Sequence, residues 1–145
     1  MSNEQYIGLI GIEELNGTVE YIQCRFLSDP NFVGYTLQTR YQSSSKVQEL
    51  IDGGNVRVLY EDSVILEKGQ KTVSTLEEYG NTYVFLNLQD DSAKTVRAKY
   101  LFTREGNWTY RIERPEKAYN GQWDSLKAYL DSDESKELRR TLHLD

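Results

Sequence analysis

Apolar and polar residues alternate near the start of the chain in a way that predicts a β-hairpin. The two expected strands are residues 6–14 and 18–26. Between them stands Asn16-Gly17, a dipeptide that favours a tight turn. The two shortest turns place either Glu13 or Glu14 opposite Glu20. Because both arrangements bring like charges together, the register of this hairpin stays open.

Two helices are predicted after the hairpin. Asp29-Pro30 suits a helix start, since Asp caps free amides and Pro fits the first helical position. Apolar residues then recur every four positions, at Val33, Leu37 and Tyr41. A second helix is expected in the segment SSSKVQELIDGG, with Ser45 and Gln48 at the spacing of a capping box and Gly53 as a left-handed stop.

The remainder of the chain predicts further strands and two terminal helices. The expected strands are residues 56–60, 63–69, 82–88, 96–104 and 108–114, with one helical turn from Ser74 to Gly80. Residues 122–130 place Trp123, Leu126 and Leu130 on one helical stripe, and residues 135–145 form a polar, fraying last helix. We therefore expect an α+β domain over residues 1–145: an antiparallel sheet of hairpins with helices packed on one face and a helical C-terminus.

The late hairpin carries the clearest face assignment. A three-residue loop, 105–107, would align Phe102 with Tyr110, Tyr100 with Ile112 and Lys99 with Glu113. One face would then be apolar, with Val96, Ala98, Tyr100, Phe102, Trp108, Tyr110 and Ile112. The opposite face would carry Arg97, Lys99, Leu101, Thr103, Thr109 and Arg111.

Composition bounds the class of protein. With 145 residues, 38% hydrophobic and 28% charged, the chain fits one ordinary globular domain. Its single Cys cannot form an internal disulfide, and no apolar stretch is long enough to span a bilayer. The start of the chain has no basic segment before an apolar run. These features favour a reducing, cytoplasmic location without membrane contact.

Charge is distributed unevenly. The formal net charge of −6 argues against general nucleic-acid binding, which needs neutralisation of phosphates. From Glu49 to Asp91 there are nine acids and three bases, whereas from Lys94 to Lys117 there are seven bases and three acids. The second stretch is therefore basic within an acidic chain, and it is the best electrostatic indication of a binding surface.

Catalytic and metal-binding patterns are lacking in the sequence. The single histidine, His143, is the third residue from the end of the sequence, where chains usually fray. One Cys and one His cannot supply a zinc set, and no glycine pattern matches a phosphate-binding loop. Cys24 has Arg25 as a neighbour, yet a structural role in a strand is favoured over reactivity. We expect a protein that is not an enzyme and that uses no metal or cofactor.

The basic stretch supplies the candidate binding residues. Arg97, Lys99 and Arg111 on adjacent strands would gather three cations over a small area of sheet. Arg is well suited to phosphate, and Tyr rings can stack on a nucleobase; the chain has eleven Tyr. The alternative is a solvated charged face balanced by Glu113, as antiparallel sheets often show.

Parts of the chain resemble a group of short uncharacterised phage and prophage proteins. The shared positions are Gly17, Thr18, Val19, Tyr21, Ile22, Cys24, Val33, Gly34, Leu37, Tyr41, Lys46, Val47, Leu50 and Ile51, and the segment KYLFTREGNWTY is similar to the group's late hairpin. After the Cys that group has His-Trp-Asp-Gly-Tyr, whereas this chain has Arg25 followed by FLSD. The substitution makes Arg25 a fourth candidate for ligand binding. The resemblance implies a phage context, and it carries over no catalytic or binding residues to this chain.

Three functions compete at this point. In the first, the protein is a sponge that sequesters a small nucleotide-derived immune signal in the host cytoplasm, with a pocket between subunits of a homo-oligomer. In the second, it is an acidic protein–protein inhibitor of a host defence nuclease, similar to anti-CRISPR proteins. In the third, it is a structural or assembly accessory of a phage.

Overall fold

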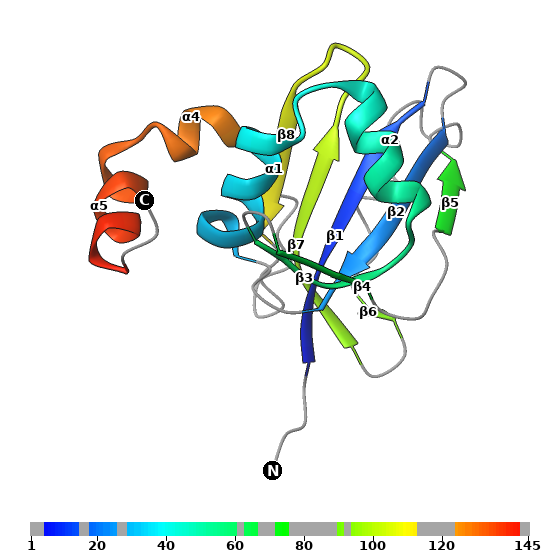
Figure 1. Ribbon diagram of the computed structural model, residues 1–145, viewed down its shortest axis with the longest axis horizontal. Coiled ribbons are helices and arrows are strands. Elements are labelled where there is room, and N and C mark those ends of the chain that lie inside the picture. Colours follow the sequence, from blue (N-terminus) through cyan, green and yellow to red (C-terminus); the bar gives the residue numbers. More distant parts are fainter. Residues whose placement is uncertain are drawn as a thin grey trace.

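A mixed β-sheet with helices on one face forms the part of the chain that the structure describes (Figure 1). This computed structural model describes residues 5–14, 18–25, 29–60, 63–66, 72–75, 90–91, 94–112 and 124–142. The described strands are β1 (Gln5–Glu13), β2 (Thr18–Cys24), β3 (Val56–Tyr60), β4 (Ser63–Leu66), β5 (Thr72–Thr75), β6 (Asp90–Asp91), β7 (Lys94–Phe102), β8 (Trp108–Ile112) and β9 (Asp124–Ser125). The helical segments are a π-helix η1 (Pro30–Gly34), α1 (Tyr35–Arg40), α2 (Ser44–Asp52), α4 (Leu126–Leu130) and α5 (Asp133–Thr141).

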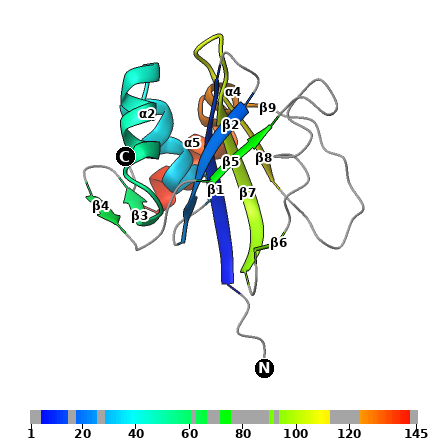
Figure 2. The same cartoon turned by 90° about the vertical axis from the view of Figure 1, so that its right-hand side faces the viewer.

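The strands follow the order β4-β3-β2-β1-β7-β8-β9, with β5 paired to β2 and β6 to β7. The α+β class and the helical C-terminus are confirmed. The predicted hairpins β1–β2 and β7–β8 are antiparallel, but β1 pairs with β7 and β2 with β3 in parallel. Parallel neighbours need a crossover connection. Here η1, α1 and α2 form the connection between β2 and β3, which places these helices over one side of the long strands (Figures 1 and 2).

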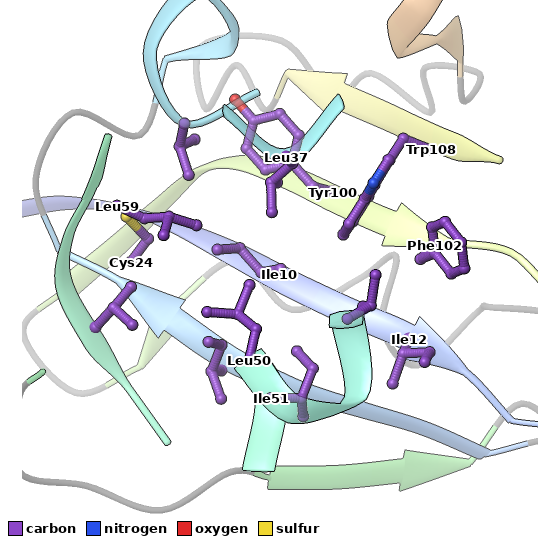
Figure 3. Close-up of a cluster of buried hydrophobic side chains, with 14 of the residues drawn as sticks. Ile10, Ile12, Cys24, Leu37, Leu50, Ile51, Leu59, Tyr100, Phe102 and Trp108 are labelled. Carbon is purple, nitrogen blue, oxygen red and sulfur yellow. The ribbon is translucent and has the colours of Figure 1, made fainter. Parts of the chain in front are cut away.

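The hydrophobic core lies between this sheet face and the helices (Figure 3). Ile10 on β1 stands opposite Ile22 on β2 and Tyr100 on β7, so three adjacent strands present buried apolar groups in one row. The helices contribute Val33, Leu37, Val47, Leu50, Ile51, Leu126 and Leu130. The predicted stripe from Val33 to Tyr41 is therefore confirmed as core-facing, with Tyr41 at its margin.

The predicted helix start is confirmed for η1 and is wrong for α2. Asp29 caps η1 by accepting a hydrogen bond from the Asn31 backbone N at 2.9 Å, with Pro30 at the start of the helix. The cap of α2 is Ser43, which accepts from the Lys46 backbone N at 3.3 Å, so the prediction of Ser45 is wrong. Because three serines follow one another here, the local sequence does not determine which of them caps the helix, and the surrounding packing decides.

The ends of α2 and of the first hairpin also differ from expectation. Gly53 has φ −72°, and the left-handed residue is its neighbour Gly54 with φ 86°. In the hairpin neither of the two short registers occurs, because Glu20 stands opposite Ile12. This register keeps Glu20 away from Glu13, which relieves the like-charge contact.

The late hairpin keeps the predicted faces but shifts its register by two residues. Phe102 pairs with Trp108, Tyr100 with Tyr110 and Ala98 with Ile112. The loop has the predicted three residues, yet it spans 104–106 rather than 105–107. Gly106 takes φ 85° at the third loop position, where three-residue hairpin loops place a left-handed residue after a type I turn. A shift of two residues leaves the paired side chains of Ala98–Phe102 and Trp108–Ile112 on their expected faces.

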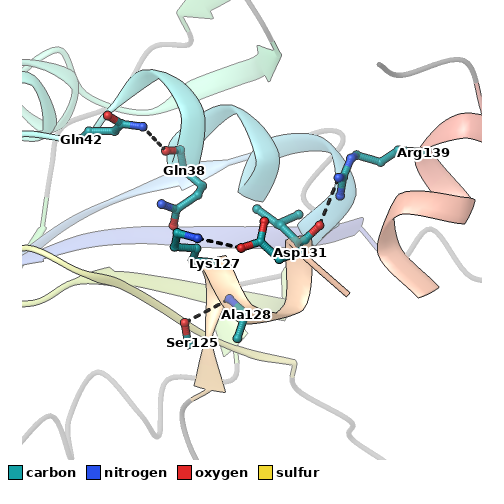
Figure 4. A network of polar contacts seen from close by, with 8 residues as sticks. Gln38, Gln42, Ser125, Lys127, Ala128, Asp131 and Arg139 are labelled. Atoms are coloured by element: carbon teal, nitrogen blue, oxygen red, sulfur yellow. Dashed lines mark hydrogen bonds and ion pairs between the residues drawn. The ribbon is translucent and has the colours of Figure 1, made fainter. Parts of the chain in front are cut away.

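The C-terminal helices α4 and α5 contact the rest of the described fold, although the sequence predicted a fraying last helix. Leu126 and Leu130 of α4 are buried as predicted, and Ser125 caps that helix through the Ala128 backbone N at 3.2 Å (Figure 4). In α5, the buried Ser135 hydroxyl donates to Asn31 Oδ1 at 2.6 Å and accepts from Arg139. A polar contact inside the fold thus joins α5 to η1.

Some expectations fall on residues outside the described ranges, namely the strand over 82–88 and the stripe position Trp123. The expected helical turn from Ser74 is wrong at its start, since Thr72–Thr75 forms β5 against β2. The single-domain organisation stays a prediction.

Candidate functional site

The candidate site lies on the sheet face opposite the main helical layer. In β7, Lys99 stands beside Leu9 of β1 on one side and Arg111 of β8 on the other. In the next row, Leu101 stands between Gly11 and Thr109. These positions alternate with the core residues of the same strands, so they share the second face. We call Lys99 and Arg111 the cation pair.

The cation pair is buried, which the sequence did not predict. Lys99 is 0% exposed and Arg111 is 6% exposed. Lysine and arginine are seldom buried to this extent unless anionic or polar groups compensate them, because desolvating a charge is costly. The alternative of a solvated charged face is therefore wrong for these two residues.

The observed register also changes what faces Lys99. The predicted partner was Glu113, which would have neutralised it, but the observed partner is Arg111. Like charges directly opposite each other destabilise a sheet. Two adjacent buried cations concentrate positive charge, which favours an anionic group nearby.

The other two candidates lie near the same end of these strands. Gly8 of β1 pairs with Cys24 on one side and Ala98 on the other, and Arg25 and Arg97 are the chain neighbours of those two residues. The β1–β7 register shifts between Ile7 and Gly8, so Arg97 is the extra residue of a bulge. The side chain of Arg97 lies outside the described part of the structure.

Arg25 follows β2 directly and is half-buried. Its backbone N donates to the Val56 carbonyl O at 3.1 Å, which continues the parallel pairing of β2 with β3. The backbone thus places all four predicted cations on or directly after neighbouring strands of one sheet region, and Lys99 and Arg111 are buried there.

Tyr100 and Tyr110 lie on the other face of the sheet. Burial raises the pKa of Tyr100 well above its usual value, with a further contribution from Asp29. Burial, followed by the nearby Asp124, raises the pKa of Tyr110 to about 12. Both phenols therefore stay protonated at neutral pH and are hydrogen-bonding groups, not nucleophiles. Tyr21, opposite Gly11, is the described tyrosine on the face of the cation pair.

Leu9 as the neighbour of Lys99, and Tyr21 as a residue of the same face, were not predicted from the sequence. Alternation along the first two strands could have placed both on a face opposite Ile10 and Ile22. The missing information was the parallel pairing of β1 with β7, because it joins segments that are far apart in the chain.

Other reactive groups contribute little here. Cys24 is a fully buried thiol among core residues, in keeping with a structural role. Within the described ranges, His, Cys, Asp and Glu side chains form no group of three or more that could hold a metal ion. No described helix is long and apolar enough to cross a membrane. His143 lies outside the described residues.

Comparisons with known proteins give no further assignment: no protein-family model, curated protein or solved structure matches this chain. The resemblance to phage proteins stays a prediction from the sequence.

Proposed function

We propose that this protein is a non-enzymatic sponge that binds a small phosphorylated nucleotide through the cation pair and keeps it from other proteins. The observation that carries the proposal is the burial of Lys99 and Arg111 side by side on adjacent strands. The resemblance to phage proteins gives the proposal its biological form, in which the nucleotide is an immune signal of the host and its capture counters defence.

Burial matters because a sponge has to hold a diffusing ligand tightly. A phosphate on a solvated surface keeps most of its water and is screened by salt, so its contacts are weak. A phosphate enclosed against two cations makes charge-assisted hydrogen bonds in a region of low dielectric, where such bonds are strong. The guanidinium of Arg111 can offer two parallel donors, and the ammonium of Lys99 adds a point charge.

Burial also has a kinetic consequence. A ligand reaches the cation pair only if the protein changes conformation to expose it. We therefore expect association slower than typical diffusional binding, and slow release once the ligand is enclosed. Slow release is what sequestration requires.

The proposal competes with a purely structural role for the pair, in which carboxylates of the chain itself neutralise both cations. A thermal-shift panel of cyclic nucleotides and ADP-ribose derivatives separates the two. A ligand at a hundred times its Kd stabilises the fold by about 2.7 kcal/mol, which for a chain of this size raises Tm by roughly 5–10 °C.

Matched variants assign the effect to the site. Arg111→Gln should weaken binding roughly ten- to a hundredfold, since a charge-assisted bond contributes about 1.5–3 kcal/mol. Arg140→Gln removes the same charge from an exposed position on α5 and should leave the affinity unchanged. Lys99→Met provides an independent variant if Arg111→Gln folds poorly. No stabilisation by any member of the panel, or equal loss in Arg140→Gln, would reject the sponge.

A further inference from the structure

A hollow lies at the end of the sheet where the β7–β8 turn meets the first turn of α2. Its volume is about 530 Å³, within the range of small-molecule sites. We call it the hairpin groove. Its floor is made by Ile12 and Phe102, and its walls come from the end of β1, the start of α2 and the turn at Arg104–Gly106.

The rim of the hairpin groove is acidic. Glu13, Glu14 and Glu105 line it, and the cation among its lining residues is Arg104. Arg104 is already engaged with Glu13: its backbone N donates to Glu13 Oε1 at 3.0 Å, and its Nε lies 3.7 Å from the same oxygen. The rim therefore has a formal charge of −2, within a chain of net charge −6.

The remaining wall is uncharged and polar. Ser44 and Ser45, both exposed in the first turn of α2, line the groove together with Gln48. Hydroxyl and amide oxygens there can accept hydrogen bonds from a cationic donor. A phosphate would meet the carboxylates at short range, which disfavours the nucleotide ligand proposed for the cation pair.

An apolar floor together with an acidic and polar rim matches one kind of chemical group, a long basic side chain. Long basic side chains cover apolar surface with their methylene stems while the charged head stays among polar groups. Ile12 and Phe102 offer the apolar floor for such a stem, and the carboxylates offer partners for its head. From this complementarity of shape and charge, we infer that the hairpin groove binds an arginine or lysine side chain on an exposed basic segment of a partner protein. The inference does not depend on the cation pair.

A backbone NMR titration tests this inference with a defined probe, the tripeptide Ac-Ala-Arg-Ala-NH2. Its matched control carries citrulline, which has nearly the same shape and no charge. We expect the arginine peptide to shift the amide signals of Thr103, Gly106 and Ser45 in a saturable way, and the citrulline peptide to leave them nearly unchanged.

Two charge-matched variants complete the test. Glu105→Gln, at the exposed rim, should lower the affinity for the arginine peptide roughly two- to fivefold, as expected for the loss of a solvent-exposed ion pair. Glu137→Gln removes the same charge from α5, where Glu137 pairs with Arg140, and should have no effect. The inference is overturned if both peptides shift the same amides equally, if the shifts fall elsewhere, or if both variants weaken binding alike.

Discussion

Replacing Ser135 by Ala should weaken the attachment of α5 to the rest of the described fold. Ser135 is 0% exposed, and its hydroxyl joins two buried polar groups. It donates to Asn31 Oδ1 at 2.6 Å and accepts from the guanidinium of Arg139. Arg139 also donates to the Leu130 carbonyl O at 3.0 Å and lies 4.7 Å from the ring centroid of Tyr35. The hydroxyl is therefore the central link between η1 and α5.

The expected loss follows from the bonds removed. A neutral hydrogen bond contributes about 0.5–1.5 kcal/mol, and a bond from a charged donor about 1.5–3 kcal/mol. Alanine recovers about 0.5 kcal/mol through its higher helix propensity. Because Arg139 keeps its bond to Leu130, we expect a net loss of about 2–3 kcal/mol in the free energy of unfolding.

Urea melts followed by circular dichroism measure this loss. Ser44→Ala, an exposed position in the first turn of α2, is the matched control and should change the free energy of unfolding by less than about 0.5 kcal/mol. A double-mutant cycle with Asn31→Ala should give a coupling energy of about 1 kcal/mol between Ser135 and Asn31. If Ser135→Ala melts like the control, α5 is not held by this contact.

Three further predictions concern the turn at Gly106, the phenol of Tyr110 and the hydrophobic core. Gly106→Ala should cost about 1–2 kcal/mol because alanine disfavours a left-handed backbone, while Gly106→Asn, measured in the same urea melts, should cost less. The pKa of Tyr110 is raised to about 12 from the ordinary 10, so the unfolded chain loses its proton first as pH rises. The stability that this group contributes is fully present below pH 10 and is lost between pH 10 and 12, so the urea midpoint should fall over that range. Tyr110→Phe should reduce the fall in the urea midpoint. An unchanged fall would contradict the assignment to Tyr110. Leu37→Ala, in the core of Figure 3, should cost about 2–5 kcal/mol in urea melts, and Ile112→Ala less because Ile112 is half-buried; equal costs would contradict the packing.

The sequence was most informative where local chemistry decides the structure. Asp29-Pro30 marked a helix start, and alternation from Ala98 to Ile112 assigned the correct side chains to the core face. Both signals come from residues close in the chain. The two-residue error in the late hairpin arose because apolar alignment alone was used, whereas the left-handed Gly106 sets where the loop ends.

Long-range pairing was not accessible in the same way. Nothing near Leu9 indicates that β1 lies beside β7 in parallel, so the neighbours of Lys99 could not be assigned. For the same reason the burial of Lys99 and Arg111 was missed: hydrophilic residues on the outer side of a hairpin predict a solvated face. The types of residue at the candidate site were predicted, but their environment depends on tertiary structure.

The most direct test of the account is NMR of the cation pair itself during titration with the nucleotide that gives the largest thermal shift. The side-chain NH signal of Arg111 would be assigned by comparison with Arg111→Lys, and the methylene signals of Lys99 by comparison with Lys99→Met. We predict that both sets of signals shift and saturate at the midpoint seen for stabilisation, with slow exchange between free and bound forms. If the nucleotide stabilises the protein while these signals stay in place, the ligand binds elsewhere, and the central claim is contradicted.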